Sequence, residues 1–151
     1  MIDRASRDKL ATALRNYASG CITNDDLDDI NVDWRDTGAV AVKERAWGLY
    51  DDTYQHRAVR KHYLSKPARD EIARWIIFLH SDSEYTWPRF SFIQIVNWPF
   101  NVVTLGWWER RKQMKFEEFM AAGDFEVWPF ARRQDYDAAL EHPRYLTGVV
   151  R

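Results

Sequence analysis

The sequence predicts a mainly α-helical fold, a compact domain of five or six helices in which residues 1–151 form a single globular unit. Two observations support this. Several segments carry apolar residues at helical spacing between capping residues. The run from Phe90 to Trp108 contains no charged side chain and many aromatic rings. Because such a run on the surface would expose a large apolar patch, we expect it to form the interior against which amphipathic helices pack.

Composition and charge exclude several classes of function. The net charge is −1 and the isoelectric point is near 6.4, so nucleic-acid binding would depend on a local basic patch. Cys21 is the single cysteine, which excludes an internal disulfide and a multi-cysteine metal site. Residues 1–9 are polar and lack the apolar core of a signal peptide, so we expect a cytoplasmic protein. Pro99 and nearby polar residues interrupt the neutral run, which therefore predicts no transmembrane segment.

Two helices are expected at the N-terminus. Residues 3–19 carry an apolar stripe at helical spacing, and Gly20 is suited to the left-handed position that ends a helix. Thr23 is a good N-cap for a short acidic helix over residues 24–30. The acidic residues there do not form a calcium loop, because Asp29 stands where an EF-hand needs glycine. A solvated acidic face is therefore the expected role.

The middle of the chain predicts two further helices. One is expected over residues 36–54, with Trp47 and Tyr54 on its buried side, and its basic continuation to Leu64 is interpreted as a frayed extension. The other begins at the N-cap Ser65 and runs to about residue 79. Its apolar stripe widens toward the C-terminal end, which we expect to be buried on both sides.

The last third of the chain leaves alternatives open. Residues 90–96 favour a strand, residues 90–105 as a whole could be strand or helix, and residues 125–130 are a second extended candidate. The sequence therefore allows one short two-stranded pairing of 90–96 with 125–130, and an α+β fold is the alternative. Helices are expected over 107–122 and over 135–142, the latter with Tyr136 and Leu140 facing inward and Pro143 ending it.

The histidines supply the candidate catalytic residues. Asp52 and His56 are four apart and would share a helix face, where the carboxylate could orient the imidazole as a general base, and Asp51 could replace Asp52. An exposed ion pair is the simpler interpretation. His56 and His62 are six apart and would lie on different helix faces, so they predict no zinc pair. No metal or cofactor site is expected, because phosphate loops and nucleophile motifs are absent from the sequence.

One further surface could bind a partner. It mixes an aromatic ring with cations, as single-strand nucleic-acid grooves do, and comprises Trp107, Arg110, Arg111, Lys112 and Lys115. Glutamates in the same segment cancel much of this charge. A solvated helix face is therefore expected, and the nucleic-acid signal of Arg110–Lys115 is weak.

Three functions follow in order of preference. The first is a non-enzymatic protein-interaction or regulatory module that binds a protein partner or a second copy of itself. The second is a small-ligand-binding protein or enzyme with an aromatic-lined pocket, where His56 and Asp52, or His80 and Glu84, converge. The third is weak nucleic-acid binding. Whether the protein is an enzyme is left open, with a non-enzyme preferred. Convergence of histidine and carboxylate groups in a concave pocket would favour the second function.

Overall fold

The computed structural model describes residues 1–51, 53–88 and 107–141, and the side chains of all of these except 107–112. Its regular elements confirm the mainly α-helical fold. The α-helices within these residues are α1 (Arg4–Ala18), α2 (Asn24–Asp28), α3 (Thr37–Ala46), α4 (Lys66–Leu79), α5 (Trp107–Ala121) and α6 (Arg133–Glu141). Short 3-10 helices are η1 (Trp47–Leu49), η2 (Arg60–His62) and η4 (Phe125–Val127).

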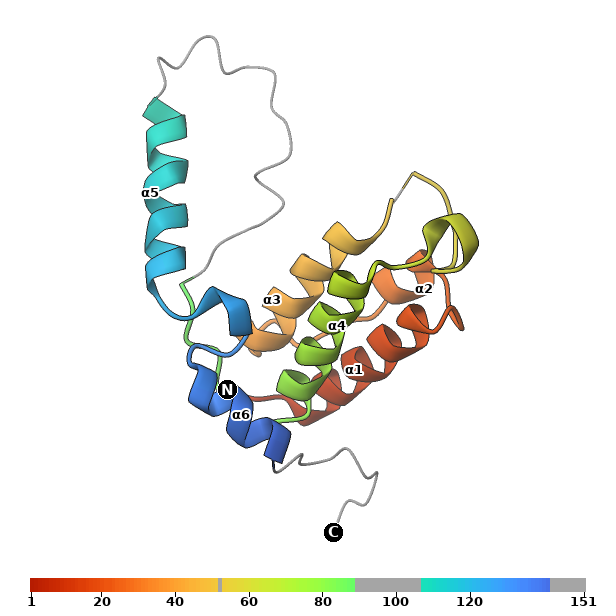
Figure 1. Cartoon of the computed structure of the whole chain (residues 1–151), viewed down its shortest axis with the longest axis horizontal. Helices are drawn as coiled ribbons and strands as arrows, with labels where there is room; N and C mark the ends of the chain where they lie inside the picture. The colour runs from red at the N-terminus through yellow and green to blue at the C-terminus, as the bar shows by residue number, and fades with distance from the viewer. Residues whose placement is uncertain (52, 89–106, 142–151) are drawn as a thin grey trace.

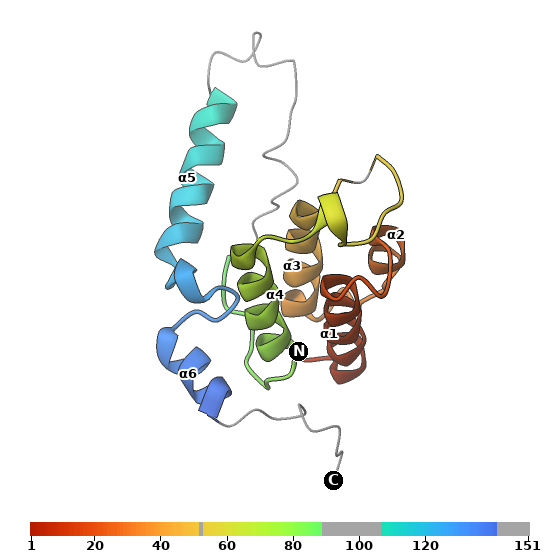
Figure 2. The ribbon, with the colours of Figure 1, turned by 45° about the vertical axis from the view of Figure 1, so that its right-hand side comes forward.

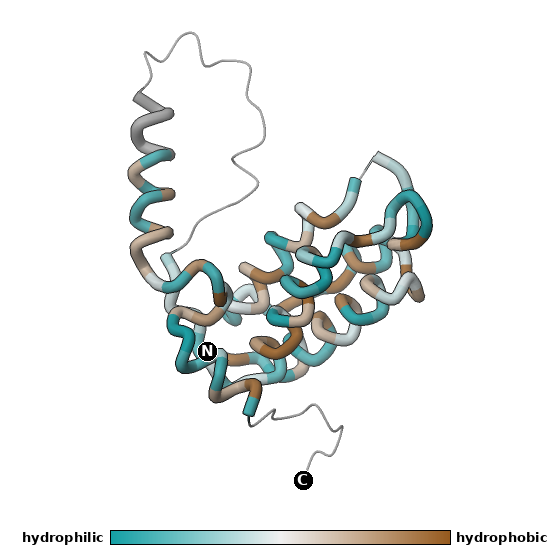
Figure 3. Tube along the Cα trace, in the orientation of Figure 1, coloured by the Kyte–Doolittle hydropathy of each residue, from teal (hydrophilic) through white to brown (hydrophobic). Residues whose placement is uncertain are grey.

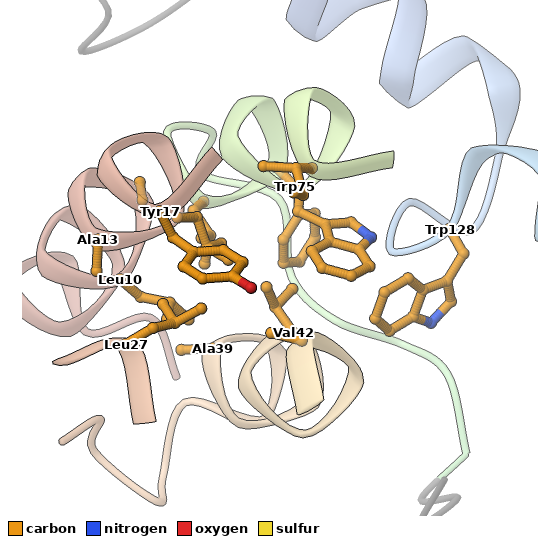
Figure 4. Close-up of a cluster of buried hydrophobic side chains, with 14 of the residues drawn as sticks. Leu10, Ala13, Tyr17, Leu27, Ala39, Val42, Trp75 and Trp128 are labelled. Atoms are coloured by element: carbon orange, nitrogen blue, oxygen red, sulfur yellow. The ribbon is translucent and has the colours of Figure 1, made fainter. Parts of the chain in front are cut away.

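Helices α1, α3 and α4 form a bundle, with α2 packed on α1 (Figures 1 and 2). Apolar positions recur along each of these helices between polar ones (Figure 3), and their buried side chains meet between the helices. Figure 4 shows Tyr17 of α1, Val42 of α3 and Trp75 of α4 converging there. Trp128, from the segment after α5, closes this core with its ring edge-to-face on Trp75 at 5.9 Å.

The capping residues act as the sequence predicts. Gly20 has a φ of 73° at the end of α1. The side chain of Thr23 accepts from the Asp26 amide, and Asp26 accepts from the Thr23 amide in return, a reciprocal cap for α2. Ser65 caps α4 by accepting from the Ala68 amide. These local signals fix where three helices begin or end.

A buried ion pair joins α1 to α3. Arg7 and Asp36 have 1% exposed side chains and share two hydrogen bonds, 2.7 Å from Nε and 3.1 Å from Nη2. Asp36 also caps α3 by accepting from the amides of Gly38 and Ala39. Burial would raise the pKa of Asp36, but the hydrogen bonds and charge of Arg7, together with the amide donors, outweigh burial and lower it.

The remaining Arg7 donors reach the segment that follows α4. Nη1 donates to the carbonyl oxygens of Ser81 and Ser83 at 3.2 and 3.0 Å. The guanidinium also lies 4.9 Å from the centroid of the Phe78 ring. The charged atoms of the pair therefore all have hydrogen-bond partners, which come from α1, α3 and the end of α4. The pair links these three segments at this end of the bundle.

The third helix is shorter than predicted. It ends at Ala46 instead of continuing to residue 54, and the exposed fractions of Trp47 and Tyr54 are both 44%, so the predicted buried side was wrong there. The reason is tertiary. The carbonyl oxygens of Asp51 and Tyr54 accept hydrogen bonds from the buried side chain of Asn24, which holds this backbone in a loop instead of a helix.

The predicted strand over residues 125–130 was also wrong. Residues 125–127 form η4, capped by Asp124, which accepts from the Glu126 amide. Val127, Trp128 and Phe130 are nevertheless buried, because this segment packs as a turn against the bundle. Trp87 fixes the turn by donating from its indole nitrogen to the Pro129 carbonyl at 3.1 Å. The apolar composition thus reflects burial and not strand pairing. The proposed partner strand, 90–96, lies outside the described residues.

Helix α5 extends away from the bundle in both views (Figures 1 and 2). Among its described side chains, Phe119 is buried against Trp87, with ring centroids 4.8 Å apart, whereas Met114, Phe116 and Met120 are exposed. No helix in the described part of the chain is both long and apolar enough to cross a membrane.

Two expectations near the end of the chain meet different outcomes. In α6, Tyr136 packs on Phe130 at 5.6 Å as expected, but Leu140 is 47% exposed, so its predicted inward position was wrong. Residues 89–106, which hold most of the neutral run, lie outside the described residues. The core seen between α1, α3 and α4 is built from other segments.

Candidate functional site

Two histidines meet in the segment between η1 and α4. The rings of His56 and His62 have centroids 4.2 Å apart and planes inclined by 35°. The sequence-based separation of these residues was wrong because it assumed a helix, whereas the chain here forms a loop and the short η2. Arg60, with a φ of 53°, lies in the left-handed region where this chain reverses.

Asn24 fixes the loop that carries His56. Its side chain is 2% exposed and accepts from the His56 amide at 2.7 Å, while its own amide donates to the His56 carbonyl at 2.9 Å. The side-chain nitrogen donates to the Asp51 and Tyr54 carbonyl oxygens at 3.3 and 3.2 Å. Asn24 is therefore a positioning residue that holds both sides of the loop against α2.

Tyr54 orients both imidazoles. His56 Nδ1 is 3.0 Å from the Tyr54 carbonyl oxygen, which can only accept, so Nδ1 carries the proton and the Nε2 of neutral His56 presents a lone pair. His62 Nε2 is 3.1 Å from the Tyr54 hydroxyl oxygen. The Lys61 ammonium lies 5.6 Å from the centroid of the same tyrosine ring.

His56, Lys61 and His62 line an open cleft of about 540 Å³ between the C-terminal end of α3 and the N-terminal end of α4. The ionisable side chains that line it are Tyr50, Asp51, His56, Lys61, His62, Tyr63 and Glu71. Its floor and walls include apolar groups from Leu49, Leu64 and Pro67. A cleft of this size with a few polar groups on an apolar surface is typical of small-ligand sites.

Charges in the cleft are unevenly compensated. Hydrogen bonds from the Thr53 hydroxyl and amide, aided by the charges of His56 and His62, lower the pKa of Asp51. Burial lowers the pKa of His62, and repulsion by His56 and Lys61 adds to this, while Asp51 opposes it. At neutral pH the cleft therefore holds an ionised Asp51 and a neutral His62.

The N-terminal end of α4 contributes few donors to the cleft. Pro67 has no amide hydrogen, and the Ala68 amide already donates to Ser65 at 3.3 Å. Glu71, on the next turn, is bonded to Arg45 at 3.3 Å. The histidines, Lys61 and Asp51 therefore supply the charged recognition groups of the cleft, and Tyr50, Tyr63 and Ser65 supply hydroxyls.

The predicted catalytic pair is only partly placed by the structure. His56 lies in the cleft, and Asp51, the stated substitute for Asp52, lines it as well. Asp52 lies outside the described residues. The helix that was to bring Asp52 and His56 together is absent, because α3 ends at Ala46.

The second predicted pair has a different composition. His80 lies at the opposite end of α4 from the cleft, with Nδ1 3.6 Å from an Asp8 carboxylate oxygen, and Asp8 stands where Glu84 was expected. Burial lowers the pKa of His80. Among the predicted surface residues, Lys115 is exposed on α5, whereas the side chains of Trp107, Arg110, Arg111 and Lys112 lie outside the described set.

Sequence reasoning missed Asn24, Lys61 and His62. Their roles depend on which backbone groups the fold brings to them, and no local pattern carries that information. Within the described residues, no group of three histidine, cysteine or carboxylate side chains is arranged to hold a metal ion.

Comparison of the chain with protein-family models, with curated proteins and with solved structures finds no match.

Proposed function

We propose that the protein binds a small ligand in the cleft between α3 and α4. The observation that carries this proposal is the convergence of His56, His62 and Asp51 on one cleft of about 540 Å³. This convergence is the arrangement that distinguishes a ligand site from scattered surface histidines. It reverses the order of preference suggested by the sequence alone.

The cleft supplies both polar and apolar recognition. The Nε2 lone pair of His56 can accept a hydrogen bond or a proton from a ligand, and Lys61 can donate one. Leu49 and Pro67 offer apolar surface beside these groups. Asn24 holds the loop in place before binding, which reduces the entropy lost when a ligand binds.

Gly48 offers a direct test. It lines the cleft, and a Cβ built there would meet no atom within 4 Å, so a larger side chain can occupy the cleft without disturbing the core. A library of small polar compounds would be screened against the ¹⁵N-labelled protein by NMR. We expect hits to shift the amide signals of residues 48–65 and to lose binding in Gly48→Leu.

Ala73→Leu is the matched control. Ala73 is exposed on α4 and does not line the cleft, so this variant should bind the hits as the wild type does. Hits that bind Gly48→Leu with unchanged affinity, or that shift only signals elsewhere, would contradict the proposal.

A protein-interaction role is the second candidate, and exposed apolar side chains of α5 favour it. Met114 and Met120 are 67% and 38% exposed on a helix that extends from the bundle. Apolar side chains grouped on one helix suit association with a second copy of the chain. Light scattering should then show a dimer that Met114→Ser converts to a monomer, whereas a monomeric wild type would remove this candidate.

A further inference from the structure

Three groups that can carry positive charge surround one aromatic ring at the cleft. The Tyr54 ring centroid lies 5.3 Å from that of His56 and 5.5 Å from that of His62. On the same ring, the Lys61 ammonium is 5.6 Å from the centroid. The two imidazoles, 4.2 Å apart, are held closer together than like charges would settle on a free surface, and the Lys61 ammonium lies on the same tyrosine ring.

The loop cannot easily separate these groups. Asn24 holds the His56 backbone on both sides, and an isolated antiparallel bridge joins Thr23 to Arg57. On the other side, η2 carries both Lys61 and His62 and leads directly into α4. Protonation of both imidazoles therefore creates repulsion that movement of the backbone does not relieve.

The acidic groups that face the cluster offset only part of this charge. Asp51 faces both histidines, and one of its oxygens already accepts from the Thr53 amide and hydroxyl at 2.9 and 2.7 Å. Glu71, across the cleft, is paired with Arg45. Tyr50 and Tyr63 also line the cleft. With both histidines protonated, cations predominate on the loop side of the cleft.

We propose that the cleft binds a small oxyanion, a carboxylate or a phosphate group, between Lys61 and the two imidazoles, and that the histidines take up protons as it binds. An anion at this point replaces repulsion among three cations with attraction to all of them. The proposal rests on the ligand-binding function above and names the class of ligand. The capped N-terminus of α4 plays no part in it.

Coupling between anion and protons fixes the direction of the pH dependence. Burial and the neighbouring cations lower the pKa of His62, and a bound anion would raise it by favouring the charged form. By linkage, affinity for the anion must then increase as the pH falls. The increase is up to about tenfold per pH unit for each proton taken up.

The test is an NMR titration of the histidine side chains of the full chain. Each imidazole would be titrated in chloride, in inorganic phosphate and in acetate at equal ionic strength. We expect phosphate or acetate to raise the pKa of His62, to shift the imidazole signals of His56, and to leave His80, at the far end of α4, unchanged. A larger effect of phosphate would indicate a phosphate group as the natural ligand, and a larger effect of acetate a carboxylate.

Variants separate a site from general ionic effects. Lys61→Gln and His62→Gln should weaken anion binding several-fold, and Asp51→Asn should strengthen it by removing a negative charge that lines the cleft. Lys66→Gln removes an exposed charge nearby that does not line the cleft, and should bind anions as the wild type does. Equal losses in Lys61→Gln and Lys66→Gln would overturn the proposal.

Two negative results have different meanings. If neutral or cationic compounds bind and are excluded by Gly48→Leu while phosphate and acetate leave His56 and His62 unchanged, the ligand-binding function stands and the oxyanion inference is wrong. If nothing binds in the cleft, both are wrong. Anion effects of the same size on His80 would also overturn the inference, because they would not come from the cleft.

Discussion

Opposite ends of the α3–α4 pair hold two clusters of ionisable side chains that differ in how fully their polar atoms are used. At one end, Arg7 and Asp36 are almost completely buried, and their polar atoms meet hydrogen-bond partners from three segments. At the other end, His56 and His62 lie beside an open cleft, and among the residues that the structure describes none forms a hydrogen bond with the Nε2 of His56. A cluster whose hydrogen-bonding groups are all used within the protein holds helices together. A cluster with unused hydrogen-bonding groups can bind a ligand.

The difference also separates stability from function. Removing one partner of the buried pair leaves the other charge unpaired in the core. The resulting loss of stability should appear in the free energy of unfolding. Changes at the cleft affect half-exposed groups and should appear mainly in ligand binding. Four predictions test this contrast.

The largest loss of stability is expected for Asp36→Ala. It leaves the Arg7 guanidinium buried without its carboxylate and removes the cap of α3, which should cost about 3–5 kcal/mol. Urea unfolding followed by circular dichroism would measure it. Asp33→Ala is the control, because Asp33 pairs with Arg35 at the surface, and it should change stability far less. Similar losses of unfolding free energy in the two variants would mean that the buried Arg7–Asp36 pair stabilises the fold no more than a surface ion pair does.

Asn24→Ala should rank next. It removes three side-chain hydrogen bonds to the loop and leaves the Asp51 and Tyr54 carbonyl oxygens to find other partners, at a cost of about 2–3 kcal/mol. Hydrogen exchange should show faster exchange of the His56 amide, while the amides of α4 keep their protection. Uniform loss of protection throughout the bundle would show that Asn24 supports the whole fold and not the loop.

Two glycines should respond in opposite directions. A Cβ at Gly38 would lie 2.9 Å from the Phe78 ring and 3.1 Å from Arg7 Nη2, so Gly38→Ala should destabilise by about 1–3 kcal/mol. Gly48 has open space at the cleft, and Gly48→Ala should stabilise by about 0.4–1 kcal/mol. Thermal unfolding of the two variants measures the difference. Equal changes in stability for Gly38→Ala and Gly48→Ala would contradict the contrast between the packed end of the bundle at Gly38 and the open cleft at Gly48.

The smallest effect concerns pH. Because folding lowers the pKa of both His62 and His80, the unfolded chain binds these protons more readily, and stability should fall as the pH drops below about 6.5. The contribution of Asp36, whose pKa is also lowered, is present above about pH 4 and lost as the pH falls through its folded pKa. In chloride, His62→Gln should reduce the loss of stability below about pH 6.5 without abolishing it, because His80 remains, and should leave the contribution of Asp36 unchanged. An unchanged loss below about pH 6.5 would show that His62 does not contribute to it.

Much of the helical framework could be predicted from residues close in sequence. Thr23 and Ser65 were identified as N-caps and Gly20 as a helix end, because capping chemistry acts over a few residues. The predicted stripe of α4 is buried at Ile72, Trp75 and Leu79. The segment 125–130 was recognised as apolar but assigned the wrong backbone, since composition indicates burial and does not distinguish a strand from a buried turn.

The candidate site was predicted only in part. His56 was selected because a carboxylate four residues away suggested a helical pair, yet among the described residues its ring lies beside those of His62 and Tyr54, in a loop. Neither the early end of α3 nor the approach of His62 follows from local spacing.

By itself the sequence determined a mainly helical chain, its caps and the residues able to carry charge, because these depend on neighbours within a turn or two. Only the tertiary structure decided which charged side chains would be paired and hydrogen-bonded inside the protein and which would line an open cleft. The physical reason is that Arg7 meets Asp36, and Asn24 meets the His56 loop, across about thirty residues of chain. Hydrogen bonds of that range exist only after the helices have packed.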